Sequence, residues 1–392
     1  MKFTLAPLAI AVATVFALPA SAATQEDQAE TIRQLEARIQ QLEETLDERV
    51  DFLADAIERQ QQDSIASRVH FGGYGELNYS NLDVDGEDVR EMDFRRWVLF
   101  VGYEFNNWVS FHSEFEVEHT VVPASDGTGA VELEQAYLEF KLADDKQLKT
   151  GIQLMPVGII SETHEPVTYY GVERPVLETT LIPTTWFAGG VMYSQQFSNG
   201  LSYDVFLSEG LQTDDPTTDS EADPFDIKSG KQKTHYANMF DLATTARIKY
   251  TGIAGLELAA YAQYQPDLDQ SAEESYADSA TMLGGHAVYQ FNSVTGKFMY
   301  VRWDLAGDAA KEAGKDVQDG MQAEVSWKPL ESLGVFGRQT YWSVEQGVDA
   351  SQTDMGVNYY PISDVVFKAS YQLQNEDAGN TDGFYLGMGY QF

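Results

Sequence analysis

Polar side chains recur at every second position of the segment W-V-S-F-H-S-E-F-E-V-E-H, which covers residues 108 to 119. On an extended strand, this spacing puts four of them on one face: His112, Glu114, Glu116 and Glu118. Imidazole and carboxylate groups are ligands that divalent transition metals accept. The pattern therefore raises the question of a metal site.

A second group of possible ligands surrounds His164, which lies between Glu162 and Glu165. Both groups have a simpler interpretation, because the same residues would serve as the polar lining of a water-filled interior. We favour this lining, and we expect neither a metal nor another cofactor.

Nucleophilic catalysis has little support in the sequence. The chain has six His and no Cys, and it contains no G-x-S-x-G motif. Ser161 lies close to His164 in sequence, but this proximity alone does not make a catalytic pair. We expect that the protein is not an enzyme.

The elements that hold these residues are strands. Beyond residue 68, apolar and polar residues alternate with a period of two, as in Val365 to Gln374. The pattern predicts sixteen strands, near 68–80, 91–105, 108–119, 131–142, 147–155, 186–197, 201–209, 240–250, 256–265, 280–291, 297–305, 319–328, 334–344, 351–360, 364–375 and 381–392. Most are as long as the roughly 9 to 11 residues that a tilted strand needs to cross a bilayer.

The connections between these strands alternate between short turns and long acidic loops. Residues 106–107 and 362–363 are tight turns, whereas 156–185 and 210–239 are long. An even strand count with this asymmetry is typical of an antiparallel, 16-stranded transmembrane β-barrel. A soluble, secreted β-sandwich would also alternate, but it would have to bury sixteen apolar faces.

Because lipid surrounds such a barrel, the position of each strand face can be predicted from its polarity. The apolar faces would contact lipid, and the polar faces would line a wet lumen. Five tryptophans close to predicted strand ends would form the interfacial girdles: Trp97, Trp108, Trp186, Trp303 and Trp327.

The N-terminal region is organised differently. Lys2, an apolar run and Ala20-Ser21-Ala22 predict a signal peptide over residues 1–22, which would be cleaved after Ala22. Residues 23–66 follow as a periplasmic segment, and the barrel occupies residues 67–392. Within residues 23–66, apolar residues at heptad spacing predict a coiled-coil helix, with a charged linker helix as the alternative. These residues are Ile32, Leu35, Ile39, Leu42, Leu46 and Leu53.

The formal net charge of -37 narrows the classes of partner. An acidic surface repels the phosphates of nucleic acid, so we exclude nucleic-acid binding.

Six segments, taken in order, resemble one family. They are F-G-G-Y-G-E-L from Phe71, R-R-W from Arg95, Q-A-Y-L-E-F from Gln135, G-I-Q-L-M-P-V-G from Gly151, Y-G-V-E-R-P from Tyr170 and the terminal Phe392. With the N-terminal heptads, they resemble the phosphate-selective porin O/P family of Gram-negative outer membranes. The resemblance implies a homotrimer of 16-stranded barrels in outer-membrane lipid, with the third long loop folded into each pore.

That third loop corresponds to residues 156–185, which hold one arginine against four glutamates. The resemblance implies a pore, and parity suggests which strand residues line it. The expected pore or constriction residues are Arg96, His112, Glu114, Glu116, Glu118, Glu162, His164, Glu173, Arg174, Arg302 and Lys368.

The predicted function is passive diffusion of ions and small hydrophilic solutes through a general or mildly cation-leaning channel, because rings of carboxylates favour cations. Two alternatives stay open. One is a phosphate- or oxyanion-selective pore, and the other is a porin that also contacts the cell wall through residues 24–66.

The chain ends on G-F-Y-L-G-M-G-Y-Q-F, which alternates like the middle of a strand. We expect this segment to close the barrel against the strand near Phe71. By resemblance, Tyr390 and Phe392 would form the signal that the barrel-insertion machinery reads.

Overall fold

The computed structural model describes residues 25–62, 65–121, 129–213, 223–270, 277–376 and 379–392. The predicted signal peptide lies outside these residues. The chain divides into two compact units, Met1–Ser67 and Arg68–Phe392. Among the described helices, none combines the length and the hydropathy needed to cross a bilayer.

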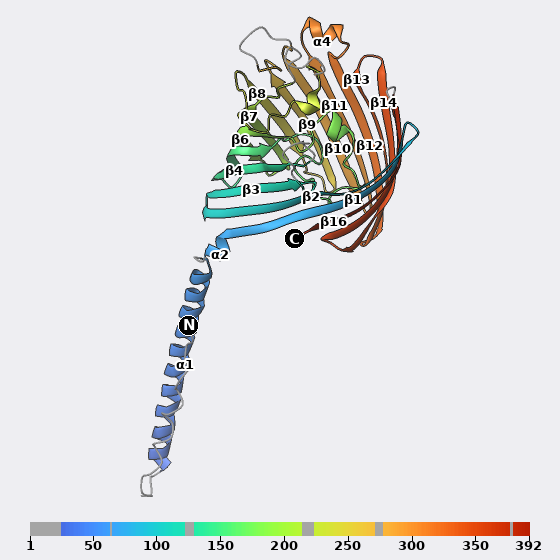
Figure 1. Cartoon of the computed structure of the whole chain (residues 1–392). Coiled ribbons are helices and arrows are strands. Elements are labelled where there is room, and N and C mark those ends of the chain that lie inside the picture. Colours follow the sequence, from blue (N-terminus) through green and yellow to red (C-terminus); the bar gives the residue numbers. More distant parts are fainter. Residues whose placement is uncertain (1–24, 63–64, 122–128, 214–222, 271–276, 377–378) are drawn as a thin grey trace. The chain divides into compact units, whose positions relative to one another are not determined.

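The second unit is a closed antiparallel barrel of sixteen strands, as the sequence predicts (Figure 1). The strands are β1 Val69–Val84, β2 Glu87–Asn106, β3 Val109–Glu118, β4 Val131–Ala143, β5 Lys146–Leu154, β6 Phe187–Gln196, β7 Leu201–Glu209, β8 Leu242–Tyr250, β9 Leu256–Gln265, β10 Ala280–Phe291, β11 Val294–Leu305, β12 Val317–Leu330, β13 Leu333–Glu345, β14 Val348–Ile362, β15 Val365–Glu376 and β16 Gly379–Gln391.

Strands β1 and β16 close the barrel. Their register runs from Tyr74 opposite Gln391 to Val84 opposite Thr381. Beyond it, Phe392 N–H donates to the Gly73 carbonyl at 2.9 Å, and Gly73 N–H donates to the Phe392 carbonyl at 3.0 Å. The last residue therefore belongs to the hydrogen-bonded wall, and the barrel has no open edge at this seam.

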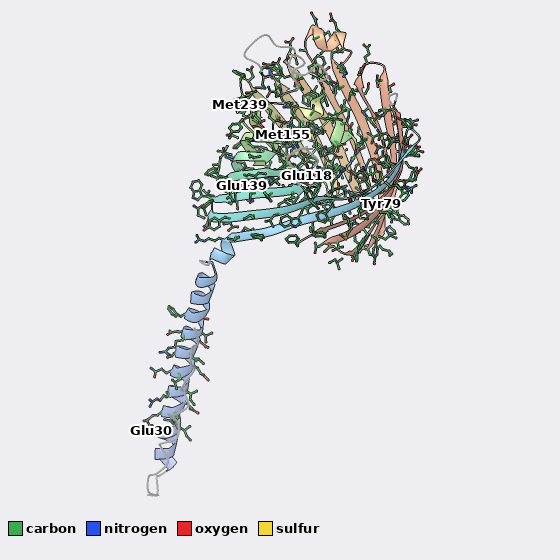
Figure 2. The ribbon with its side chains drawn as sticks, in the orientation of Figure 1. Glu30, Tyr79, Glu118, Glu139, Met155 and Met239 are labelled. Atoms are coloured by element: carbon green, nitrogen blue, oxygen red, sulfur yellow. The ribbon has the colours of Figure 1, made fainter. Side chains whose placement is uncertain are left out.

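Side chains alternate between the two faces of the wall, as in the expected pleat (Figure 2). On β15, Phe367 is 47% exposed on the outer face, while the next residue, Lys368, is 5% exposed in the interior. The outer face of β16 carries Phe384 and Leu386, and Gly387 faces inward.

Two of the five predicted girdle tryptophans lie inside the barrel instead. Trp186 and Trp303 are 3% and 0% exposed, and their rings lie 6.2 Å apart. Trp97, Trp108 and Trp327 are exposed on the outer face.

The interior tryptophans belong to an apolar core that the lumen was not expected to contain. The connection from β5 to β6 folds inward and includes α3, Leu177–Thr180. Its buried apolar residues pack in one cluster with inward-facing apolar residues of β9 to β11 and with Trp342 of β13. Elsewhere, η1 Ile227–Ser229 lies between β7 and β8, and α4 Asp308–Glu312 lies between β11 and β12.

The first unit contains the helix α1 Gln25–Gln62, and the short helix α2 Ile65–Arg68 follows it. Five of the heptad residues are 55% to 63% exposed on the single chain: Ile32, Leu35, Ile39, Leu42 and Leu46. Association of this stripe in a coiled coil stays a prediction.

Candidate functional site: the constriction loop and the passage beside it

The connection from β5 to β6, residues 155–186, is the constriction loop. At its base, Met155 N–H donates to the Trp186 carbonyl at 2.7 Å. On one side of the lumen it is held by apolar contacts, with Leu177, Leu181 and Met155 fully buried. The indole Nε1 of Trp303 on β11 donates to the Leu181 carbonyl at 2.8 Å. The loop therefore fills the part of the lumen next to β9 to β12.

Polar side chains hold the loop on the neighbouring part of the wall, at β13 to β15. Three successive loop carbonyls each accept a hydrogen bond from a different strand: Tyr169 from Asn358 of β14, at 3.2 Å; Tyr170 from Arg338 of β13, at 2.7 Å; and Gly171 from Lys368 of β15, at 2.8 Å. These bonds fix the loop backbone because its carbonyls would otherwise be buried without partners.

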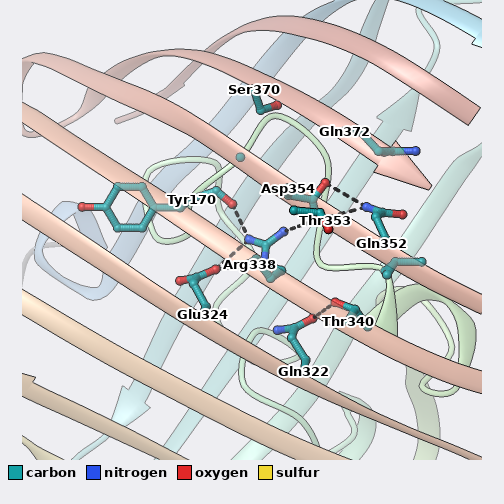
Figure 3. A network of polar contacts seen from close by, with 12 residues as sticks. Tyr170, Gln322, Glu324, Arg338, Thr340, Gln352, Thr353, Asp354, Ser370 and Gln372 are labelled. Atoms are coloured by element: carbon teal, nitrogen blue, oxygen red, sulfur yellow. Dashed lines mark hydrogen bonds and ion pairs between the residues drawn. The ribbon is translucent and has the colours of Figure 1, made fainter. Parts of the chain in front are cut away.

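Arg338 is the centre of the network in Figure 3, between Tyr170 and two acids. Its Nη2 lies 2.8 Å from Oε2 of Glu324, and its Nη1 lies 3.5 Å from Oδ2 of Asp354. The side chains of Arg338 and Glu324 are only 2% and 1% exposed. This buried arginine joins strands β12, β13 and β14 to the loop.

A polar cavity of about 430 Å³ lies between the loop and the strands β1, β2 and β14 to β16. A cavity of this volume has room for water and small ions. Its lining includes Glu76, Arg95, Arg96, Glu118, His119, Tyr169, Glu173, Arg174, Gln352, Gln372 and Tyr385.

Most charges along this cavity are matched by opposite charges. Arg96 Nε lies 2.7 Å from Oε1 of Glu76, and its Nη1 lies 3.4 Å from Oε1 of Glu116. Arg95 Nη2 lies 2.6 Å from Oε2 of Glu173. Of the wall acids expected to attract cations, Glu116 is thus paired with an arginine, whereas Glu118 lines the cavity without an ion pair among the described residues.

Arg174 differs from these arginines. Its side chain is buried and its Nη1 donates to Thr185 Oγ1 at 2.5 Å, while Nε and Nη2 have no hydrogen-bond partner in the described part of the chain. No carboxylate of the described residues pairs with Arg174 within 4.0 Å, the limit for an ion pair. The loop therefore places an arginine beside the cavity whose Nε and Nη2 are buried without partners among the described residues.

Comparison with known proteins agrees with this architecture. The family model described as phosphate-selective porin O and P matches residues 68–304. The chain belongs to this family. The resemblance read from the sequence is thus confirmed, and the protein is an outer-membrane channel porin by family and fold.

A curated relative of this porin is an uncharacterized protein of Aquifex aeolicus (strain VF5). It is 35% identical over 183 residues, which are 46% of this chain and 41% of that protein. The match therefore spans less than half of the relative.

Solved porins share the fold at low identity. An anion-selective porin from Comamonas acidovorans has a TM-score of 0.59 at 11% identity, over 83% of this chain and 99% of its own. The outer membrane channel DcaP of Acinetobacter baumannii has a TM-score of 0.58 at 12% identity, over 83% and 97% of the two chains. OmpT of Vibrio cholerae, in trimer form, has a TM-score of 0.53 at 12% identity, over 83% and 99%.

Several residues named from the sequence do meet at the constriction of this porin. Glu173, Arg174, Glu118 and Arg96 line the cavity. Lys368 lies beside it, with its Nζ 3.6 Å from the centre of the Tyr169 ring.

Other named residues lie elsewhere around the loop. Glu162 pairs with Arg247 of β8. His164, which is 4% exposed, faces Glu114 and Glu134. His112 is farther from the constriction, where its Nε2 lies 3.0 Å from Ser110 Oγ and its ring stacks on Tyr137.

Arg302 does not line the pore, and its prediction was wrong. It lies on the outer face of β11, opposite Leu283, which is 52% exposed. Its Nη2 lies 2.5 Å from Oδ1 of Asp304, which shares that face. In this part of β11 the inner face is apolar and the outer face carries charges, the reverse of the pattern expected for the wall. The reason is that the constriction loop covers the inner face with apolar residues.

Two residues at the site were missed because β-bulges turn them inward. The β1–β2 register shifts where Glu76 pairs with Arg96 and Asn78 pairs with Asp93, so that Arg95 joins Arg96 on the inner face. A bulge adds one residue to a strand, so beyond it the odd- and even-numbered side chains exchange the faces to which they point.

The second bulge is at Glu134 in β4. The β3–β4 register passes from Glu114 opposite Gln135 to Phe115 opposite Leu133, which leaves Glu134 as the extra residue. Its carboxylate is buried and lies close to His164. A run such as E-L-E-Q at 132–135 carries no signal that would have revealed this bulge.

Proposed function

We propose that this porin lets small solutes diffuse passively through the cavity beside the constriction loop, and that Arg174 makes this passage favour small oxyanions. The observation that carries the proposal is the guanidinium of Arg174: the residue lines the cavity, and its buried Nε and Nη2 have no partner among the described residues, whereas Arg95 and Arg96 are paired with glutamates. An anion that enters a narrow pore loses hydration, and a guanidinium can replace the lost hydrogen bonds.

The cation-leaning interpretation rested on the number of carboxylates along the wall. Glu76, Glu116 and Glu173 are each within 3.4 Å of an arginine nitrogen. A paired carboxylate attracts a passing cation less than a free one, because the two charges largely cancel at a distance. The fold neighbour from Comamonas acidovorans is described as anion-selective, which is in line with the proposal.

The experiment compares purified porin with Arg174→Gln in planar bilayers, through reversal potentials in a KCl gradient. We expect the wild type to favour chloride over potassium, and the variant to lose at least about fivefold in this ratio, because a unit charge at 4 Å in water is worth about 1 kcal/mol. Phosphate should reduce the wild-type chloride current more than that of the variant.

Arg302→Gln is the matched control, because it removes an arginine from the outer face of the same barrel. Its reversal potential should equal that of the wild type. A cation-selective wild type would refute the oxyanion preference, as would a reversal potential that Arg174→Gln leaves unchanged.

We also propose that three copies associate and that the heptad stripe of α1 contributes to their association. The stripe is more than half exposed on one chain, and apolar residues at heptad spacing are usually covered by partner helices. The trimer form of OmpT from Vibrio cholerae shares the fold.

Deletion of residues 24–66 separates this role from a tether to the cell wall. If the truncated porin becomes monomeric in detergent, the helix supports assembly. If it stays trimeric, conducts unchanged and is lost from the cell-wall fraction, the helix is a tether and the proposal on its role in association fails.

A further inference from the structure

Three buried side chains converge where the constriction loop meets the wall: Glu114 of β3, Glu134 of β4 and His164 of the loop. Each offers one ligand atom, and these atoms lie within 4.8 Å of one another. The side chains of the three residues are 1%, 2% and 4% exposed. They lie outside the set of residues that line the polar cavity.

The converging atoms have no hydrogen-bond partners in the described part of the chain. They are Oε1 of Glu114, Oε2 of Glu134 and Nε2 of His164. Buried polar atoms without partners are costly and rare in native proteins. Three of them aimed at one point indicate that something charged or polar lies between them.

The neighbours of these residues orient them for ligation. Nδ1 of His164 lies 3.1 Å from the Ser161 carbonyl, so Nδ1 donates to that oxygen and leaves Nε2 facing the two carboxylates as the ligand atom. Gln135 Nε2 donates to the other oxygen of Glu114 at 2.6 Å. Such outer partners fix the orientation of metal ligands in proteins.

The distances between the three side chains fit a bridging ion better than a direct hydrogen bond. Nε2 of His164 lies 3.4 Å from the Glu114 oxygen and 3.6 Å from the Glu134 oxygen. A charge-assisted N–H···O bond would be shorter, about 2.7 to 2.9 Å. Ligand atoms bound to tetrahedral zinc at about 2.0 to 2.2 Å are about 3.4 Å apart, which is close to the two separations from His164.

We propose that Glu114, Glu134 and His164 form a divalent-cation site that takes zinc, with water as the fourth ligand, and that the ion fastens the constriction loop to β3 and β4. An imidazole with two carboxylates suits Zn²⁺ better than Ca²⁺ or Mg²⁺, which prefer oxygen ligands alone. The two carboxylates balance the charge of the ion. Arg174 supplies no ligand to this site, although it lines the same small pocket as His164.

The first test measures zinc bound to the folded porin after equilibration with Zn²⁺ and dialysis against buffer, with metal content read by mass spectrometry. We expect about one zinc per wild-type chain. His164→Gln and Glu134→Gln should each abolish this zinc, and Gln135→Leu should weaken binding by about 10- to 100-fold, as losses of outer partners do.

His286→Gln is the matched control, since His286 is a buried wall histidine that lies 2.9 Å from a single carboxylate, Glu257. It should retain the zinc. Heat-modifiable migration in gel electrophoresis and channel activity in bilayers establish that each variant is folded.

A second test needs no variant. Co²⁺ bound to the wild-type porin should give the intense visible absorption of a tetrahedral site, and Zn²⁺ should displace it. The proposal is overturned if the wild type retains no zinc, if both ligand variants retain as much as the wild type, or if bound cobalt shows only the weak absorption of an octahedral ion.

Discussion

Replacement of Arg338 by methionine should loosen the constriction loop and destabilise the barrel together. The methionine side chain fills much of the volume of the arginine, but it removes the guanidinium from between Glu324 and Asp354. It also removes the donor to the Tyr170 carbonyl. The change thus leaves two acids and one loop carbonyl without their shared partner.

The magnitude follows from the burial of this group. Breaking a buried ion pair by removing one partner costs about 3 to 5 kcal/mol, and this range includes the lost hydrogen bond of about 1 kcal/mol. Glu324 retains Lys297, whose Nζ lies 3.0 Å from Oε1. Because one acid keeps a cation, we expect the lower end, about 3 kcal/mol.

Urea unfolding of the porin in lipid vesicles measures this loss, and single-channel recordings measure the loop. Arg338→Met should raise current noise, since the loop loses one of its three anchored carbonyls. Adding Asp354→Asn should restore part of the stability, because it removes one of the uncompensated acids.

Arg338→Lys serves as the intermediate control, since it keeps the charge but not the planar fork that reaches three partners. A loss below about 1 kcal/mol in Arg338→Met would contradict the assigned role, because that is the range of an exposed ion pair. A further loss on adding Asp354→Asn would contradict it as well.

Three further predictions test other parts of the wall and loop. Gly389→Ala should destabilise the barrel by about 1 to 3 kcal/mol in urea, because the new Cβ would lie 2.4 Å from Cβ of Pro166 in the loop, whereas Gly337→Ala, with no atom within 4 Å, should be neutral. Phe392→Ser keeps the backbone hydrogen bonds between β1 and the chain end, so the conductance of assembled pores should stay unchanged. The yield of porin in the outer membrane should fall. Equal losses of yield and conductance would count against a role of Phe392 in insertion. Burial lowers the pKa of Lys231, between β7 and β8, to about 8, so its positive charge is lost as the pH rises through 8. The chloride preference of the wild type, measured with a chelator present, should therefore fall over this pH range. The chloride preference of Lys231→Met should not change over the same range.

The number of strands, and their ends to within four residues, could be predicted from the sequence because the wall obeys a local rule. Lipid on one side and water or polar side chains on the other impose the period of two, and this holds along β15 and β16. Even the inward glycines of β16 could be placed by parity. Their reason became visible only in the structure, where the loop lies directly against Gly387 and Gly389.

The interior of the barrel could not be predicted in the same way, because the loop changes what an inward residue contacts. On β11, Trp303 faces inward onto Trp186 and the Leu181 carbonyl, while Arg302 faces outward. A rule that places aromatic residues on the outer face and charged residues on the inner face assigns both Trp303 and Arg302 to the wrong face. Only knowledge of which strands the loop covers would have corrected it.

The two bulges explain why the chemistry of the constriction was harder to predict than its location. Arg95 and Glu134 each sit at a position where one strand has an extra residue, and each side chain turns toward the loop. Bulges often re-aim side chains next to functional sites. Here they lie at the residues that contact Glu173 and His164, so that the wall meets the loop with charges that strict alternation would have sent to lipid.

Charge pairing also separates the selectivity of the pore from the composition of the chain. The net charge of -37 belongs to the whole surface, where it affects solubility and the approach of ions. Selectivity depends on the few groups that an ion meets after losing water. At the constriction, Arg95 and Arg96 are held by glutamates, whereas Nε and Nη2 of Arg174 have no partner among the described residues. An acidic porin can therefore favour anions, provided that its acids are neutralised where the passage is narrowest.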